Sequence, residues 1–121
     1  EIRLASTTYV AELKNGEVNE WEITPEHVEI ESQTLVGLMV EDSAQSLALI
    51  NDALGKKKSA VGEKAAHMIA LNAGAGIYVS GLTTSYKQGV ALAHDIIYGG
   101  QALEKLSVLS EFTKTLKQYQ A

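Results

Sequence analysis

The first part of the chain alternates apolar and polar residues with the two-residue period of β-strands. TTYVAEL (7–13) and EVNEWEI (17–23) are rich in β-branched and aromatic residues, and Lys14-Asn15-Gly16 separates them. Because two such runs lie so close together along the chain, they predict an antiparallel β-hairpin.

The loop between these strands decides which side chains share a face. A two-residue Asn-Gly turn would pair Leu13 with Val18. It would also set Tyr9 opposite Glu22, so apolar and acidic residues would mix on both faces. A three-residue loop, with Gly16 in a left-handed bulge, sorts them instead, and we expect this loop and its register. The apolar face would then contain Tyr9, Ala11, Leu13, Trp21 and Ile23.

From residue 24 onward, apolar residues recur at helical spacing between start and stop signals. Thr24-Pro25-Glu26 predicts one short helical turn, and residues 29–40 predict an irregular connection. Four longer helices follow, bounded by capping residues and glycines. We expect them from Asp42 to Gly55, from Ser59 to Gly81, from Ser85 to Gly99-Gly100, and over about 101–118. The pattern therefore predicts a hairpin followed by four helices, without an internal repeat or a flexible linker.

The stretch ALNAGAGIYVSG, residues 70–81, places Asn72, Gly74 and Gly76 inside the second of these helices. Each mid-helix glycine costs about 0.5–1 kcal/mol relative to alanine, so a compensating gain is expected. One interpretation is a glycine-rich phosphate cradle, but such loops lie between a strand and a helix start. We favour close helix packing, with Asn72 bonded to a neighbouring backbone group. The small-residue surface would comprise Ala66, Ala70, Ala73 and Gly74.

Composition limits the classes of function. The 121 residues suffice for one domain with a hydrophobic core. The net charge is −5 and no basic stripe is visible, which argues against binding to nucleic acid or to an anionic membrane. The longest basic run, KKK at 56–58, is expected to be a solvated loop. Cysteine is absent, which excludes disulfides and thiol catalysis. No membrane span or signal peptide is visible.

Candidate catalytic and metal-binding residues are sparse. His27, His67 and His94 lie far apart in the sequence, without an HExxH motif. His67 and His94 lie in predicted helices, and each is expected to be a partnered or half-exposed side chain rather than a ligand. No GxSxG elbow supports a hydrolase triad. Clustered carboxylates can hold Mg²⁺ or Ca²⁺, but the acidic residues here lack calcium-loop spacing, so we expect a solvated surface. These residues are Glu17, Glu20, Glu22, Glu26, Glu29 and Glu31.

Three segments, taken in order, resemble one known enzyme family. VAELKNGEV after EIRLAST, then ALNAGAGIYVSG, then GGQALEKL resemble the C-terminal part of the anthranilate phosphoribosyltransferases, over essentially all 121 residues. The resemblance implies an α/β fold of the nucleoside phosphorylase and phosphoribosyltransferase type. Residues 1–121 would form the C-terminal portion of its large α/β domain. The N-terminal helical domain and the phosphate-binding loop would lie upstream, and the start at Glu1 without a methionine suggests a processed or truncated product.

The same resemblance implies a pentosyltransferase of tryptophan biosynthesis. Family members transfer phosphoribose from phosphoribosyl pyrophosphate to anthranilate and use Mg²⁺. An Asp-Glu pair binds this ion in the family, and Glu1 aligns with its second member, so Glu1 is the one metal ligand carried over. No catalytic or substrate-binding residue is expected in this chain, which alone would be inactive. The intact enzyme would be a cytoplasmic homodimer.

Two other interpretations stay open on the sequence. The chain could be a free-standing helical interaction module without catalysis, because no complete site is visible in it. It could also belong to a relative of the pyrimidine nucleoside phosphorylases, which resemble the same fold group. The parent transcript or the intact mass would identify a free-standing module, and substrate assays on the intact protein would identify a phosphorylase relative.

Overall fold

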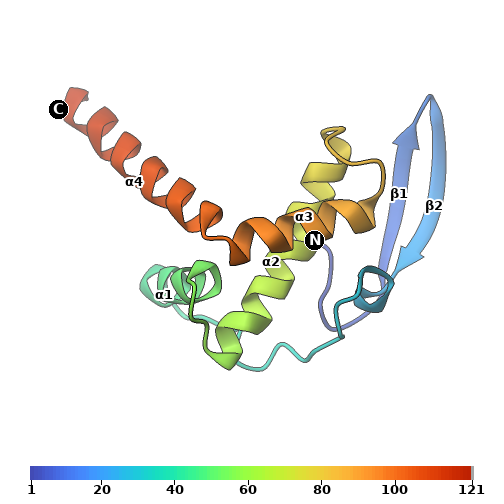
Figure 1. Ribbon diagram of the computed structural model, residues 1–121, viewed down its shortest axis with the longest axis horizontal. Coiled ribbons are helices and arrows are strands. Elements are labelled where there is room, and N and C mark those ends of the chain that lie inside the picture. Colours follow the sequence, from blue (N-terminus) through green and yellow to red (C-terminus); the bar gives the residue numbers. More distant parts are fainter. Residues whose placement is uncertain (121) are drawn as a thin grey trace.

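The computed structural model describes residues 1–120 as a two-stranded hairpin, a short 3-10 helix and four α-helices (Figure 1). The elements are β1 (Thr8–Lys14), β2 (Glu17–Ile23), η1 (Pro25–Val28), α1 (Ser43–Leu54), α2 (Ala60–Val79), α3 (Tyr86–Tyr98) and α4 (Gln101–Tyr119). Figure 1 shows the hairpin on one side of α2 and α3 and the far end of α4 on the other. The predicted succession of elements and its α/β class are confirmed.

Three of the helices begin at the capping residues that the sequence predicts, each through a side-chain oxygen. Each oxygen accepts a hydrogen bond from a backbone N–H three residues downstream, which satisfies a group that the helix itself leaves without a partner. The caps are Asp42 for α1, Ser59 for α2 and Ser85 for α3, at 2.8, 3.0 and 3.1 Å. Gly55 and Gly99 follow the ends of α1 and α3, also as predicted.

The hairpin register differs from the prediction, and the expected three-residue loop is wrong. Asn15 and Gly16 both adopt left-handed conformations, with φ of 53° and 77°, as a two-residue type I′ turn requires. Leu13 therefore pairs with Val18. The turn decides the register because Asn-Gly reaches positive φ at little cost and its twist matches that of the strands.

This register divides the apolar side chains between the two faces of the hairpin. Trp21 and Ile23 lie on the inner face, toward the helices, and Ile23 is buried. Tyr9, Leu13 and Val18 lie on the outer face and are 76%, 72% and 65% exposed. The predicted single apolar face is therefore wrong, and the outer face, which also contains Glu20 and Glu22, remains uncovered within residues 1–120.

Close packing of α2 against α3 explains Gly74. A Cβ on Gly74 would stand 2.6 Å from the backbone N and Cα atoms of Val90. A Cβ on Gly89 would likewise collide with the carbonyl oxygen of Gly74. Since backbone atoms cannot turn aside as side chains do, the two helices approach this closely only because both positions are glycine.

The rest of the predicted small-residue surface is confirmed only in part. Ala66 and Ala70 precede Gly74 at four-residue intervals on one face of α2, and both are almost fully buried. Ala73 is exposed and lies outside this surface. Outside its own helix, no described atom lies within 4 Å of the position that a Cβ on Gly76 would take, so packing does not require that glycine.

The core lies where α2, α3 and the inner face of the hairpin meet. The rings of Trp21 and Tyr86 are tilted with centroids 6.4 Å apart, and the Tyr86 hydroxyl donates to the carbonyl oxygen of Leu71 at 2.8 Å. Burial raises the pKa of Tyr86 to about 12. Leu4 is fully buried, which ties the N-terminal segment to this core. In the described chain, no helix combines the length and hydrophobicity needed to cross a bilayer.

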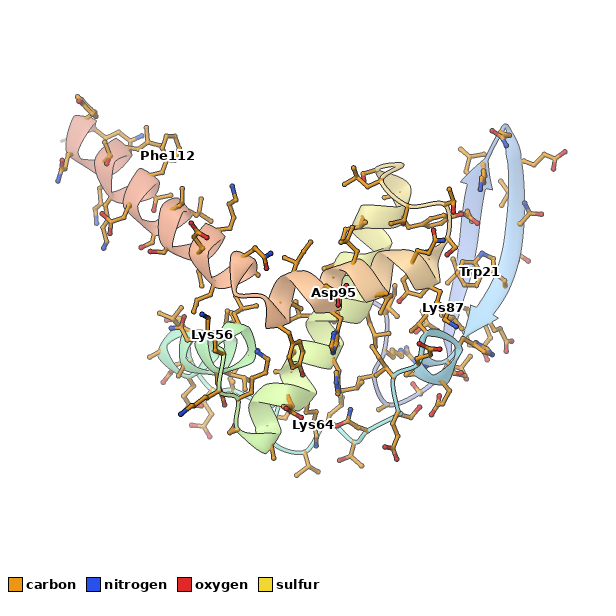
Figure 2. All side chains as sticks on the ribbon, viewed as in Figure 1. Trp21, Lys56, Lys64, Lys87, Asp95 and Phe112 are labelled. Atoms are coloured by element: carbon orange, nitrogen blue, oxygen red, sulfur yellow. The ribbon has the colours of Figure 1, made fainter. Side chains whose placement is uncertain are left out.

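The last helix, α4, leaves the body of the molecule after its first turns. Leu103 and Leu106 pack against the core, but the apolar residues beyond them are exposed. Figure 2 shows Phe112 on the part of α4 that extends away from the other helices. The predicted helix is confirmed, yet its outer apolar stripe has no covering element in residues 1–120. This α4 stripe comprises Val108, Leu109, Phe112, Leu116 and Tyr119.

Candidate functional site

Glu1, the expected metal ligand, lies exposed at the rim of an open groove of about 490 Å³. The wall of the groove is mostly apolar and comes from α1, α2 and the connection before α1, with Leu49, Met68 and Ile69 among its lining residues. The arrangement therefore presents one carboxylate beside an apolar wall.

A side chain of α2 holds the segment that follows Glu1. The Oδ1 atom of Asn72 accepts from the N–H of Ile2 at 2.8 Å, and its Nδ2 atom donates to the carbonyl oxygen of Ile2 at 3.0 Å. Nδ2 also donates to the carbonyl oxygen of Met68 at 3.0 Å. The prediction that Asn72 bonds to a neighbouring backbone group is confirmed, although Asn72 is half-buried and its partner Ile2 lies 70 positions away.

The surroundings of Glu1 fit a magnesium ion to a limited extent. Across residues 1–120 there is no group of three His, Asp or Glu side chains that could hold a metal ion. Proteins commonly bind Mg²⁺ through one or two carboxylates and leave the other positions to water and substrate phosphates. An exposed carboxylate at the edge of a groove fits one such position, so Glu1 could supply one of several ligands.

The six glutamates of residues 17–31 are all exposed, as predicted for a solvated surface. Glu26 receives hydrogen bonds from the N–H and the hydroxyl of Ser32, both at 3.0 Å. These bonds to the charged carboxylate lower the pKa of Glu26 to about 2. Glu29 forms an ion pair with Lys87 at 3.2 Å, with both side chains largely in solvent. These are local surface contacts.

His67 and His94 lie together in the structure, although they are far apart in the sequence. Their rings stack with centroids 6.4 Å apart, and His94 stacks on Tyr98 at 4.2 Å. The Nε2 atom of Gln33 lies 3.0 Å from Nδ1 of His67. Burial, and then the charge of His94, hold the pKa of His67 below its usual value. Both histidines are partnered, as predicted, but the cluster itself was not foreseen.

Only part of this cluster has a signal in the sequence. His94 and Tyr98 stand at i, i+4 spacing, which places them on one face of a helix. Lys58 completes the cluster with its Nζ atom 4.4 Å from the centroid of Tyr98, and it is half-buried rather than solvated as predicted. The third histidine, His27, lies apart and accepts from the N–H of Thr24 at 3.1 Å.

Comparison with known proteins gives consistent matches. Residues 1–103 match the family described as glycosyl transferase family, a/b domain. The anthranilate phosphoribosyltransferase of Acinetobacter baylyi is 79% identical over 119 residues, which are 98% of this chain and 34% of that protein. The enzyme of the same name from Acinetobacter baumannii (strain AYE) is 69% identical over 121 residues, 100% of this chain and 35% of that protein. That of Pseudomonas syringae pv. tomato is 57% identical over 118 residues, 98% and 34%.

These matches confirm the resemblance seen in the sequence. The family match extends from the N-terminal segment through α3 and into the first residues of α4. The chain spans about a third of the length of the curated relatives that it matches. On the extent of the family match, this chain belongs to the glycosyl transferase family, a/b domain.

Proposed function

We propose that this chain is the C-terminal portion of an anthranilate phosphoribosyltransferase of tryptophan biosynthesis. The observation that carries the proposal is 79% identity over 98% of the chain to a relative of that name. The structure supports a scaffolding role, because Glu1 is the one carboxylate that lines the groove beside α1 and α2, and no group of three metal-binding side chains occurs in residues 1–120. The working groups of the reaction would then lie mainly in the rest of a longer polypeptide.

The uncovered apolar surfaces support the proposal that further protein packs on this chain. They are the outer face of the hairpin, the groove beside Glu1 and the α4 stripe. Soluble proteins seldom leave large apolar patches in water, whereas a domain cut from its neighbours exposes the surfaces that those neighbours covered. We propose that residues 1–121 form the C-terminal part of a larger α/β domain, within a cytoplasmic homodimer.

In the proposed reaction, the amine nitrogen of anthranilate bonds to C1 of the ribose as the bond from C1 to the diphosphate oxygen breaks. The diphosphate leaves with the electron pair of that bond, and the amine nitrogen loses one proton to solvent. Mg²⁺, when bound, would neutralise charge on the leaving diphosphate. Glu1 would contribute one carboxylate oxygen to that ion. Because Asn72 bonds the segment of Glu1 to α2, this chain presents its ligand from a helical scaffold rather than from a free end.

A chimera tests the proposal directly. In it, this chain replaces the matching third of the Acinetobacter baylyi enzyme, and turnover is measured with phosphoribosyl pyrophosphate, anthranilate and Mg²⁺. We expect activity comparable to that of the parent enzyme. A folded chimera that does not use anthranilate, or that instead cleaves pyrimidine nucleosides with phosphate, would contradict the proposal.

The role of Glu1 is tested in the same chimera. Glu1→Gln should raise the Mg²⁺ concentration needed for half-maximal rate, because an amide oxygen is a weaker ligand for this ion than a carboxylate. Glu31→Gln is the matched control, since Glu31 is exposed, lies outside the apolar surfaces on which further protein is proposed to pack, and loses the same charge. An equal magnesium requirement in both variants would remove Glu1 from the metal site.

A further inference from the structure

All three hydrogen bonds of the Asn72 side chain go to backbone atoms, and two of them go to Ile2, near the start of the chain. Oδ1 accepts from the N–H of Ile2 at 2.8 Å and Nδ2 donates to its carbonyl oxygen at 3.0 Å. Asn72 thus pairs with Ile2 as a neighbouring strand would. Figure 1 shows the N-terminal end of the chain beside the middle of α2, where this pairing is made.

This pairing fixes the backbone of Glu1. The N–H of Ile2 belongs to the planar peptide unit that joins the two residues, so the bond to Asn72 places the Cα atom of Glu1 relative to α2. For the described part of the chain, no other hydrogen bond reaches Ile2. Further along, Leu4 is fully buried and its carbonyl oxygen accepts from the N–H of Gln33 at 3.2 Å. Without the bonds to Asn72, that anchor would hold the segment at Leu4 but would leave Glu1 free to rotate.

We propose that Asn72 is a positioning residue for the metal-ligand carboxylate of Glu1. The inference rests on the proposed function, in which Glu1 binds Mg²⁺. This ion demands near-octahedral geometry, so a ligand whose backbone is already fixed loses less conformational freedom on binding. Asn72 acts through the Glu1–Ile2 peptide and needs no contact with the ion.

The variant Asn72→Ala is expected to fold. Alanine is a better helix former than asparagine, so α2 itself gains from the change. Ile2 is half-buried, and water can reach the N–H and carbonyl groups that lose their partner. The substitution therefore frees Glu1 without opening the core.

The test measures metal binding rather than turnover. Mn²⁺, which replaces Mg²⁺ at oxygen sites, is titrated into the chimera and its variants and followed by electron paramagnetic resonance. Asn72→Ala should weaken Mn²⁺ binding about 10-fold or more, as other supports of metal ligands do. Tyr86→Phe is the matched control, because it removes a hydrogen bond to the carbonyl oxygen of Leu71 in the same helix but leaves the N-terminal segment untouched. Its Mn²⁺ affinity should not change.

A double variant separates the possible outcomes. If Asn72 acts through Glu1, Asn72→Ala should cause no further loss in the Glu1→Gln background. Hydrogen exchange should rise over residues 1–4 but not over α2, which checks that the loss is local. Unchanged Mn²⁺ affinity in Asn72→Ala, or losses that simply add in the double variant, would overturn the inference and leave the proposed function standing. Unchanged affinity in Glu1→Gln would overturn both the metal role of Glu1 and the inference.

Discussion

Gly74→Ala should destabilise this chain, although alanine is the better helix former. The added methyl group would stand 2.6 Å from the backbone N and Cα atoms of Val90 and equally close to its Cγ2 atom. The side chain of Val90 can rotate away, but its backbone is held within α3. The methyl group is therefore accommodated only if α2 and α3 move apart, which loosens the contacts of the whole interface.

The magnitude follows from two opposing contributions. Alanine is favoured over glycine inside a helix by about 0.8–1.0 kcal/mol. Overpacking a filled interior costs about 1–3 kcal/mol, and the upper end applies here because the obstacle is backbone. The free energy of unfolding should therefore fall by about 1–2 kcal/mol, which corresponds to a loss in Tm of several degrees for a chain of this size.

Gly76→Ala is the matched control, since it lies two positions further along the same helix. Outside that helix, no described atom lies within 4 Å of its added methyl group, so only the helix-propensity gain applies and stability should rise by about 0.5–1 kcal/mol. Urea unfolding of the 121-residue chain, followed by far-ultraviolet circular dichroism, measures both variants. If Gly74→Ala proves as stable as the parent chain, or more stable, the close approach of α2 and α3 is refuted.

Surface contacts predict further effects. The pKa of Glu26 is about 2 against an ordinary 4.5, so the stability that its charged form contributes is present above pH 4.5 and is lost as the pH falls toward 2. The free energy of unfolding of Glu26→Gln, measured in urea, should therefore fall less than that of the parent chain over this pH range. Equal losses in the variant and the parent chain would contradict this prediction. The lowered pKa of His67 means that the fold disfavours its charged form, so the free energy of unfolding in urea should fall as the pH drops below 6.5. His67→Leu should remove this pH dependence, and a dependence that persists in the variant would show that another group causes it. Phe112→Glu should change stability by less than about 0.5 kcal/mol but reduce self-association in sedimentation velocity, and a large loss of stability would show that Phe112 is buried.

Element boundaries could be predicted from the sequence because the interactions that set them are short in range. Asp42, Ser59 and Ser85 each cap a helix through a backbone group three residues away, which places the whole interaction within one readable stretch. The packing of the helices could be predicted only in outline. The four-residue spacing from Ala66 and Ala70 placed Gly74 on the small-residue surface, but only the position of α3 shows that this glycine is required and that Gly76 is not.

Less of the candidate site could be predicted from the sequence, because its contacts join segments that are far apart along the chain. Nothing near Asn72 in the sequence indicates that its partner is Ile2, and nothing near His67 indicates His94. The proposed metal role of Glu1 rests on family resemblance rather than on any local pattern. Sequence reasoning could thus state that Asn72 bonds to backbone, whereas only the fold shows which backbone and therefore what the bond positions.

The error in the hairpin register is itself informative about the proposed larger protein. The expectation of a single apolar face assumes that one side of a two-stranded sheet is buried and the other meets water. Here Tyr9, Leu13 and Val18 lie on the face opposite Trp21, so this chain covers the inner face of the hairpin and leaves the apolar residues of the outer face exposed. A hairpin with apolar residues on both faces is expected where both faces are covered. The pattern that misled the register prediction is therefore the one expected if further protein packs against the outer face of the hairpin.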